Sequence, residues 1–163
     1  MQIAVGKMTG YVIVFLRLAL AASYLSSVTS RFGFWGEDVG WGHYSTFLEY
    51  TAKVNPFLPI SLVPTVGRIV DVAEISIAVL LIVGFRTRET ALVSGVMLLL
   101  FALAMSACAG VGIISTLDHS VYTACAASFL LAIHNESSLS LDALLKKRSS
   151  ASIAPGRLIS RPS

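Results

Sequence analysis

The sequence predicts an all-α fold: a polytopic membrane protein in which four transmembrane helices form a bundle, with a short interfacial helix in the first outer loop. The chain of 163 residues is 55% hydrophobic and only 13% charged, whereas soluble domains carry about 25% charged residues. It holds four apolar runs, and a transmembrane helix needs about 20 apolar residues. This composition excludes a soluble enzyme. The net charge of +3 gathers in short loops and the tail, which argues against nucleic acid as a partner.

The four spans are expected at about residues 8–28, 64–84, 90–110 and 118–134. The first span follows Lys7, and the charge of Arg17 inside it argues against a cleaved signal peptide. The second begins at Pro64, a residue that suits the first turn of a helix, and ends at Gly84. The third lies in the longest uncharged run of the chain, and the fourth is short and bounded by polar residues.

The basic residues predict that both termini lie in the cytoplasm. Eight of the 12 Lys and Arg residues fall on the side that holds the termini, two fall on the other side, and two lie within spans. Positive residues concentrate on the cytoplasmic side of membrane proteins. We therefore expect residues 1–136 to form the membrane domain. Residues 137–163 are expected to be a basic, Ser-rich cytoplasmic tail without fixed structure.

The only long connection, residues 29–63, is expected to face outward and to lie at the membrane surface. Eight of the chain's 15 aromatic residues fall in it, and amphipathic aromatic side chains collect at the headgroup level. Apolar residues from Tyr44 to Val54 recur at helical spacing, so a short interfacial helix is predicted there, ended by Asn55 and Pro56. Such a loop either caps the bundle or gates access of a substrate.

Four charged residues inside the predicted spans form the candidate polar site: Arg17, Arg68, Asp71 and Glu74. Intramembrane charges are costly and are usually paired or functional. Arg17 lies ten residues from Lys7 and Glu74 lies ten from Gly84, which places both about 15 Å deep. An Arg17–Glu74 ion pair is therefore predicted, with Arg68 beside Asp71. The ladder is either a structural clamp or a polar site for a quinone headgroup, a proton or a small anion.

Other candidate chemistry is sparse. Asp118 and His119 precede the fourth span as outer-face polar residues, and helix capping by Asp118 is the default interpretation. Cys108 and Cys125 lie in apolar runs and are interpreted as small buried residues. No pattern of a metal site or of a catalytic nucleophile is present in the sequence, so no catalytic residue is assigned.

Several segments together resemble the DoxX family of small bacterial four-helix membrane proteins. They are Leu16-Arg17-Leu18-Ala19-Leu20 in the first span, and Glu74 followed by Leu80-Leu81-Ile82-Val83-Gly84-Phe85-Arg86-Thr87-Arg88 in the second. The resemblance extends over most of residues 8–134. Many relatives carry a Gly-x-x-Lys after the first span, and here Ser27 and Arg31 stand near that place.

The resemblance implies redox-linked work in the bacterial cytoplasmic (inner) membrane. It suggests a non-catalytic membrane subunit, or a quinone-pool adaptor, of an oxidoreductase complex, with a quinone as cofactor and other subunits of the complex as partners. The alternative is an independent carrier or binding protein for a small lipid-soluble molecule. In both interpretations the lipid bilayer surrounds the protein.

Overall fold

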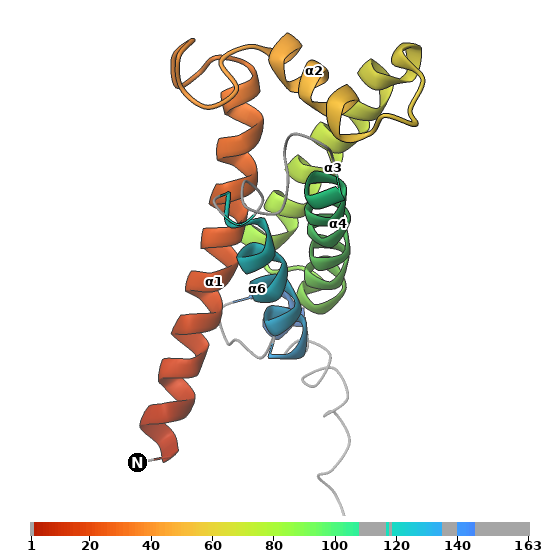
Figure 1. The fold of residues 1–163 in the computed structure, drawn as a ribbon. Helices are drawn as coiled ribbons and strands as arrows, with labels where there is room; N and C mark the ends of the chain where they lie inside the picture. The colour runs from red at the N-terminus through yellow and green to blue at the C-terminus, as the bar shows by residue number, and fades with distance from the viewer. Residues whose placement is uncertain (1, 108–116, 118, 135–139, 146–163) are drawn as a thin grey trace, which may run out of the picture.

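The computed structural model describes residues 2–107, 117, 119–134 and 140–145, and this part of the chain is all-helical, without a strand. The principal helices are α1 (Gln2–Arg31), α2 (Tyr44–Val54), α3 (Val63–Val83), α4 (Thr87–Ala107) and α6 (Val121–Ile133), and a 3-10 turn, η1 (Ile60–Leu62), precedes α3. Figure 1 shows α1, α3, α4 and α6 side by side, with α2 lying across one end. That end is called the outer end below. The all-α prediction is confirmed.

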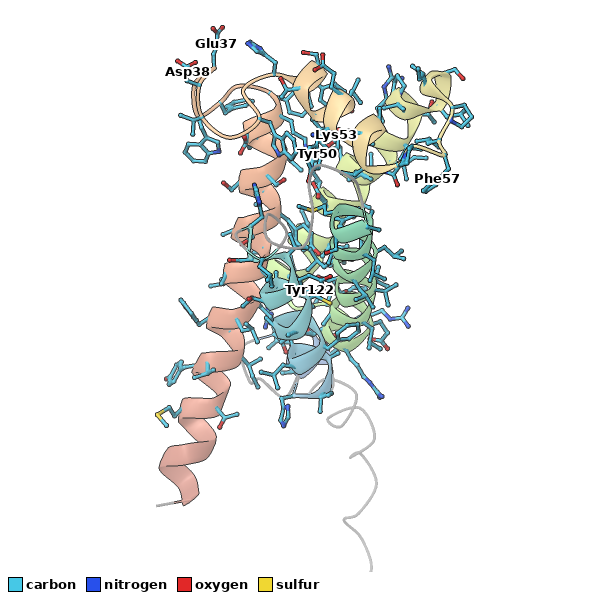
Figure 2. The ribbon with its side chains drawn as sticks, in the orientation of Figure 1. Glu37, Asp38, Tyr50, Lys53, Phe57 and Tyr122 are labelled. Carbon is cyan, nitrogen blue, oxygen red and sulfur yellow. The ribbon has the colours of Figure 1, made fainter. Side chains whose placement is uncertain are left out.

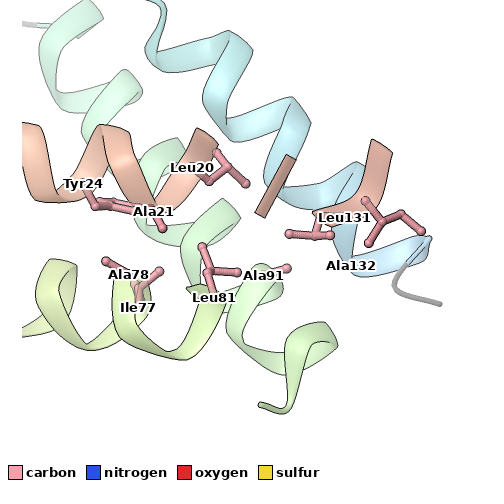
Figure 3. Close-up of a cluster of buried hydrophobic side chains, with 10 residues drawn as sticks. Leu20, Ala21, Tyr24, Ile77, Ala78, Leu81, Ala91, Leu131 and Ala132 are labelled. Atoms are coloured by element: carbon pink, nitrogen blue, oxygen red, sulfur yellow. The ribbon is translucent and has the colours of Figure 1, made fainter. Parts of the chain in front are cut away.

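Antiparallel pairs build the bundle. Along α1 and α3, Arg17 contacts Leu81 whereas Arg31 contacts Asp71. Residue numbers therefore rise on one helix as they fall on the other. α4 and α6 are also antiparallel, because Ser94 contacts Ser128 whereas Ser106 contacts Tyr122. The shared core takes small and branched side chains from all four helices (Figure 3): Ile13, Leu20, Ala21, Tyr24, Ile77, Ala78, Leu81, Ala91, Leu131 and Ala132.

Local sequence explains where the helices begin and end. Pro64 stands in the first turn of α3, where its missing N–H is no loss. Gly84 ends the helix with φ +70°, and its N–H and that of Phe85 both donate to the Leu80 carbonyl. The expected second span, 64–84, thus differs from α3 by one residue at each end. The helix expected between Tyr44 and Val54 is present as α2, followed by Asn55.

Within the described residues, two helical stretches are long and apolar enough to cross a membrane, Met8–Arg31 and Thr87–Ala107. α3 is as long as α4, with 21 residues, but it carries three ionisable side chains, and α6 is apolar with 13 residues. The expected end of the third span at Gly110, and Cys108 with it, lie outside the described residues, as do Asp118 and most of the tail. Within the tail, residues 141–145 form a helical turn.

The bundle carries its apolar side chains on the outside as well as in the core. Large hydrophobic residues on the outward faces of α1, α3 and α4 are largely exposed, among them Phe15 (73%), Val72 (65%) and Leu100 (61%). The charged side chains of Arg17, Asp71 and Glu74 point inward instead and are buried. This distribution of side chains is the reverse of the one in a soluble protein, where apolar residues fill the interior and charged residues are almost never fully buried.

Candidate functional site

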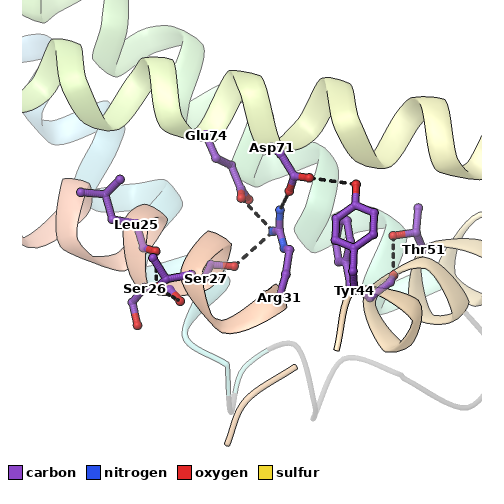
Figure 4. Close-up of polar contacts among 10 residues, drawn as sticks. Leu25, Ser26, Ser27, Arg31, Tyr44, Thr51, Asp71 and Glu74 are labelled. Carbon is purple, nitrogen blue, oxygen red and sulfur yellow. Dashed lines mark hydrogen bonds and ion pairs between the residues drawn. The ribbon is translucent and has the colours of Figure 1, made fainter. Parts of the chain in front are cut away.

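The outer end of the bundle contains a buried ionic cluster of Arg31, Asp71 and Glu74, shown in Figure 4. Arg31 is the last residue of α1, and its guanidinium forms ion pairs with Asp71 through Nη1 and with Glu74 through Nη2, the latter at 2.8 Å. Nη2 also donates to Ser27 Oγ at 3.1 Å. The three residues are 3–8% exposed. One cation is therefore shared by two carboxylates within the bundle.

Aromatic residues cover this cluster. The Tyr44 hydroxyl of α2 donates to Asp71 Oδ2 at 2.9 Å, so α2 is tied to α3 through the cluster. The Arg31 guanidinium lies 3.9 Å from the centroid of the Phe47 ring, a cation–π contact that favours the charged arginine. Phe32 stacks on Tyr44 with ring centroids 5.5 Å apart. Burial and the hydrogen bond to Asp71 raise the pKa of Tyr44, so its hydroxyl stays protonated as a donor.

A pocket of about 300 Å³ lies beside the cluster and opens outward. Arg31, Phe32, Glu37, His43 and Tyr44 line it, with Gly33 and Gly42. The volume lies at the lower end of the range for small-molecule sites, roughly 300–1,000 Å³. Figure 2 shows Glu37 at the tip of the loop between α1 and α2. The pocket thus joins the outer surface to the aromatic cover and to the buried arginine.

The loop between α1 and α2 holds its shape through glycines with positive φ. Gly33, Gly36, Gly40 and Gly42 have φ between 64° and 106°, which other residues rarely adopt. At Gly42 a Cβ would also meet the backbone of Glu37. The Trp41 N–H donates to Ser30 Oγ at 2.8 Å and anchors the loop to the last turn of α1. These turns hold His43 and Tyr44 over the cluster.

Arg17 does not pair with Glu74, so the predicted ion pair is wrong. Its Nε donates to the Leu81 carbonyl at 2.8 Å and its Nη2 donates to the Ile82 carbonyl at 3.0 Å, at the C-terminal end of α3. The prediction equated the depths of Lys7 and Gly84, but α1 begins at Gln2 and its first turns extend beyond the end of α3 (Figure 1). Arg17 is instead level with Gly84, whose absent Cβ leaves room for the guanidinium.

The predicted ladder of four charges is therefore replaced by a cluster of three. Arg68 is exposed, and Asp71 pairs with Arg31 rather than with Arg68. Sequence reasoning missed Arg31 because it stands at the end of the apolar run, where a positive charge is typical of a loop. The signal that could have found it is the spacing of Ser27 and Arg31, one helical turn apart on the face toward α3.

The hydroxyl groups in the centre of the bundle form a second polar feature. Tyr24 Oη lies 2.7 Å from Ser94 Oγ, and Ser94 Oγ lies 2.9 Å from Ser128 Oγ, which joins α1, α4 and α6. Cys125 is buried, and its thiol donates to the Gly95 carbonyl at 3.3 Å. His119, the described member of the expected outer-face pair, is exposed just before α6. None of these groups is among the residues that line the outer pocket.

The opposite end of the bundle is held by Asp142. Its carboxylate accepts the backbone N–H of Arg86 at 2.8 Å and of Thr87 at 2.9 Å, and so caps the N-terminus of α4. Burial alone would raise the pKa of Asp142, but the hydrogen bonds from Thr87 and Arg86 outweigh it and lower the pKa. The described part of the tail is thereby fixed to the turn between α3 and α4.

No protein-family model, no curated protein and no solved structure matches this chain. The resemblance to the DoxX family thus remains a prediction from the residues quoted above.

Proposed function

We propose that this protein is a four-span integral membrane protein of the bacterial cytoplasmic membrane, with both termini in the cytoplasm. The support is the distribution of side chains: apolar residues cover the outward faces of α1, α3 and α4, and charged residues are buried between helices. In water such a surface would be a strong aggregation liability, whereas in a bilayer it is the expected one. In this proposal α3 crosses the membrane with Asp71 and Glu74 turned toward α1, and Arg68 is exposed near the outer end of the helix.

The cluster then lies in the outer half of the bilayer. Arg17 is level with the basic turn that contains Arg86, which marks the inner surface in this proposal. Arg31 lies 14 residues further along α1, or about 21 Å at the helical rise of 1.5 Å per residue. The hydrocarbon layer is about 30 Å thick. A lipid-soluble molecule could therefore reach the pocket from the outer half of the membrane.

We propose that the pocket binds the polar head of a small lipid-soluble molecule, with a quinone as the first candidate. A quinone head is flat and carries two acceptor oxygens, so it needs aromatic faces and N–H or O–H donors. The pocket offers the stacked rings of Phe32 and Tyr44, the imidazole of His43 and the guanidinium of Arg31. Among the described residues, the buried Nε–H of Arg31 has no hydrogen-bond acceptor. This unused donor, on a residue that lines the pocket, is the observation that carries the proposal.

On this basis the protein would be a non-catalytic membrane subunit or quinone-pool adaptor of an oxidoreductase complex. The pocket would hold the quinone at one place at the outer end of the bundle. The alternative is an independent carrier of the same molecule. Copurification separates the two roles, because an adaptor retains a protein partner in mild detergent whereas a carrier elutes alone with its ligand.

Tryptophan fluorescence tests the pocket. The chain's two tryptophans, Trp35 and Trp41, lie in the loop that frames the pocket, and quinones quench indole emission on close approach. Titration of the protein in detergent with a short-chain ubiquinone analogue should give saturable quenching. Substitution His43→Ala or Phe32→Ala should weaken it. Phe57→Ala removes an aromatic ring that is 83% exposed outside the pocket, and it should leave the curve unchanged. Quenching that is linear and equal in all variants would reject the pocket as a quinone site.

A further inference from the structure

The outer cluster carries an unbalanced charge. Arg31 contributes one positive charge, and Asp71 and Glu74 each contribute a carboxyl group, so the ionised cluster would have a formal charge of −1. All three residues are more than nine-tenths buried. A buried charge without a counterion is strongly disfavoured, and two carboxyl groups that share one site do not both ionise readily. A proton on one of the two carboxyls would make the cluster neutral.

Among the described residues, Arg31 is the one buried cation that contacts the two carboxyls. From α1, Tyr24 also lies toward the cluster and is hydrogen-bonded to Ser94. From α2, Tyr44 donates to Asp71, while the charged residues of that helix are exposed. Arg68 of α3 acts on Tyr44 but is exposed, as is His43 at the pocket, so water screens the charge there. Arg88 and Glu89 lie at the end of α4 far from the cluster, and a proton is therefore the balance that we infer for the buried carboxyls.

The contacts distinguish the two carboxyls. Both oxygens of Asp71 accept a hydrogen bond, one from Arg31 and one from Tyr44, as expected of an ionised carboxylate. Glu74 is placed differently. Its Oε2 lies 2.8 Å from Arg31 Nη2, yet it is buried and accepts no well-directed hydrogen bond from the described part of the chain. The less solvated and less hydrogen-bonded carboxyl is the one that keeps its proton.

We propose that Glu74 holds an exchangeable proton at neutral pH, and that the cluster is a proton-binding site served by the outer pocket. Release leaves the Glu74 carboxylate beside Arg31 and passes H⁺ to water in the pocket, and uptake reverses this step. Arg31 and Tyr44 line the pocket and contact the carboxyls, so the path to the outside runs past Tyr44. The inference rests on the proposed membrane site, because it names a ligand of that same cluster. It does not depend on quinone binding.

Infrared spectroscopy of isotope-labelled protein tests the proposal. The wild-type protein is labelled with ¹³C at its glutamate carboxyls and reconstituted in phosphatidylcholine nanodiscs at neutral pH. We expect a C=O stretching band of a protonated carboxyl that shifts with the glutamate label and moves in D₂O. The band should be absent from Glu74→Gln and retained in Glu49→Gln, which removes an exposed carboxylate of α2. Tyr44→Phe should retain the band and slow its shift in D₂O.

Two results would overturn the proposal: the absence of a protonated glutamate band in the labelled wild type, or a band that follows an aspartate label instead. Because these arms use the wild-type chain, they stand even where Glu74→Gln fails to fold. Replacement of choline by Na⁺ in the buffer should leave the band unchanged, and its loss in Na⁺ would indicate a cation site instead. A quenching titration without saturation would reject quinone binding and leave the proton site standing, so the two proposals fail separately.

Discussion

Arg31 Nη2 lies 2.8 Å from Glu74 Oε2, and this contact fixes the register in which α1 packs against α3 at the outer end of the bundle. At the other end Arg17 holds the carbonyls of Leu81 and Ile82. Two arginines of one helix, 14 residues apart, thus bind one neighbour at two levels. Arg31 is shared by two carboxyl groups, and Arg17 donates to backbone carbonyls that the last turn of α3 leaves without a helical partner.

Loss of Arg31 is expected to be among the most damaging single changes in the chain. Arg31→Met leaves two carboxyls buried without a cation, and breaking a buried pair in this way costs about 3–5 kcal/mol. Thermal unfolding in detergent measures this as a lower Tm. Arg31→Met with Asp71→Asn should recover part of the loss, since the second change removes the ionised carboxylate that would otherwise be left buried without its cation. Arg17→Met with Glu74→Gln should be additive, because these residues do not touch. Recovery in the double variant of Arg17 and Glu74, and none in that of Arg31, would instead support the predicted register in which Arg17 pairs with Glu74.

Tyr44→Phe should weaken the attachment of α2. The substitution removes the hydroxyl that donates to Asp71, and a hydrogen bond to a charged group contributes about 1.5–3 kcal/mol. Tyr11→Phe is the matched control, since Tyr11 is 67% exposed on α1. Equal Tm values for the two variants would show that the hydroxyl does not tie α2 to α3.

Stability should also fall at high pH because of Tyr44. Its pKa in the folded protein is raised above the ordinary value of 10.0, so its contribution is fully present below that value. The contribution is lost as the pH rises through the folded-state pKa. Comparison of Tm from pH 9 upward should show a steeper loss in wild type than in Tyr44→Phe. Parallel curves would contradict the assignment.

Gly84→Ala should destabilise the protein through two effects at once. The residue has φ +70°, which costs a residue with a side chain about 1–2 kcal/mol. An added Cβ would also lie 2.6 Å from Cζ of Arg17 and displace it from the carbonyls. Gly10→Ala is the control: Gly10 is helical, nothing lies within 4 Å of its Cβ position, and this change should be neutral or stabilising by up to about 1 kcal/mol. A neutral Gly84→Ala would exclude the close approach of Arg17.

Asp142→Ala should loosen the tail from the turn between α3 and α4. The carboxylate caps two N–H groups at the start of α4, and loss of such a cap costs about 0.5–2 kcal/mol. Its pKa is lowered below the ordinary 3.8, so the contribution is present above that pH and is lost as the pH falls below it. Protease accessibility of the tail reports release. Asp38→Ala changes an exposed loop residue and should not increase cleavage.

Much of the helical layout was predictable from the sequence, because unbroken apolar runs and the Pro64 and Gly84 signals are local. The register between helices was not. Hydrophobic periodicity places Arg17 and Glu74 on inward faces, but it does not say how far α1 extends beyond the end of α3. Arg31 was not predicted for a related reason. A basic residue at the end of an apolar run is typical of a loop, and its carboxyl partners lie 40 or more positions away in the sequence. The role of Tyr44 depended on the same long-range contact.

Accessibility of single cysteines in intact cells tests the proposed membrane topology most directly. In a background with Cys108 and Cys125 replaced by alanine, a cysteine is placed at Glu37 in the outer loop, at Arg88 in the first turn of α4, or at Ser150 in the tail. We expect a membrane-impermeant maleimide to label the Glu37 position from outside, and to label the Arg88 and Ser150 positions only after the membrane is opened. Labelling of the Glu37 and Arg88 positions from the same side would contradict the proposal, because α3 would then not cross the membrane.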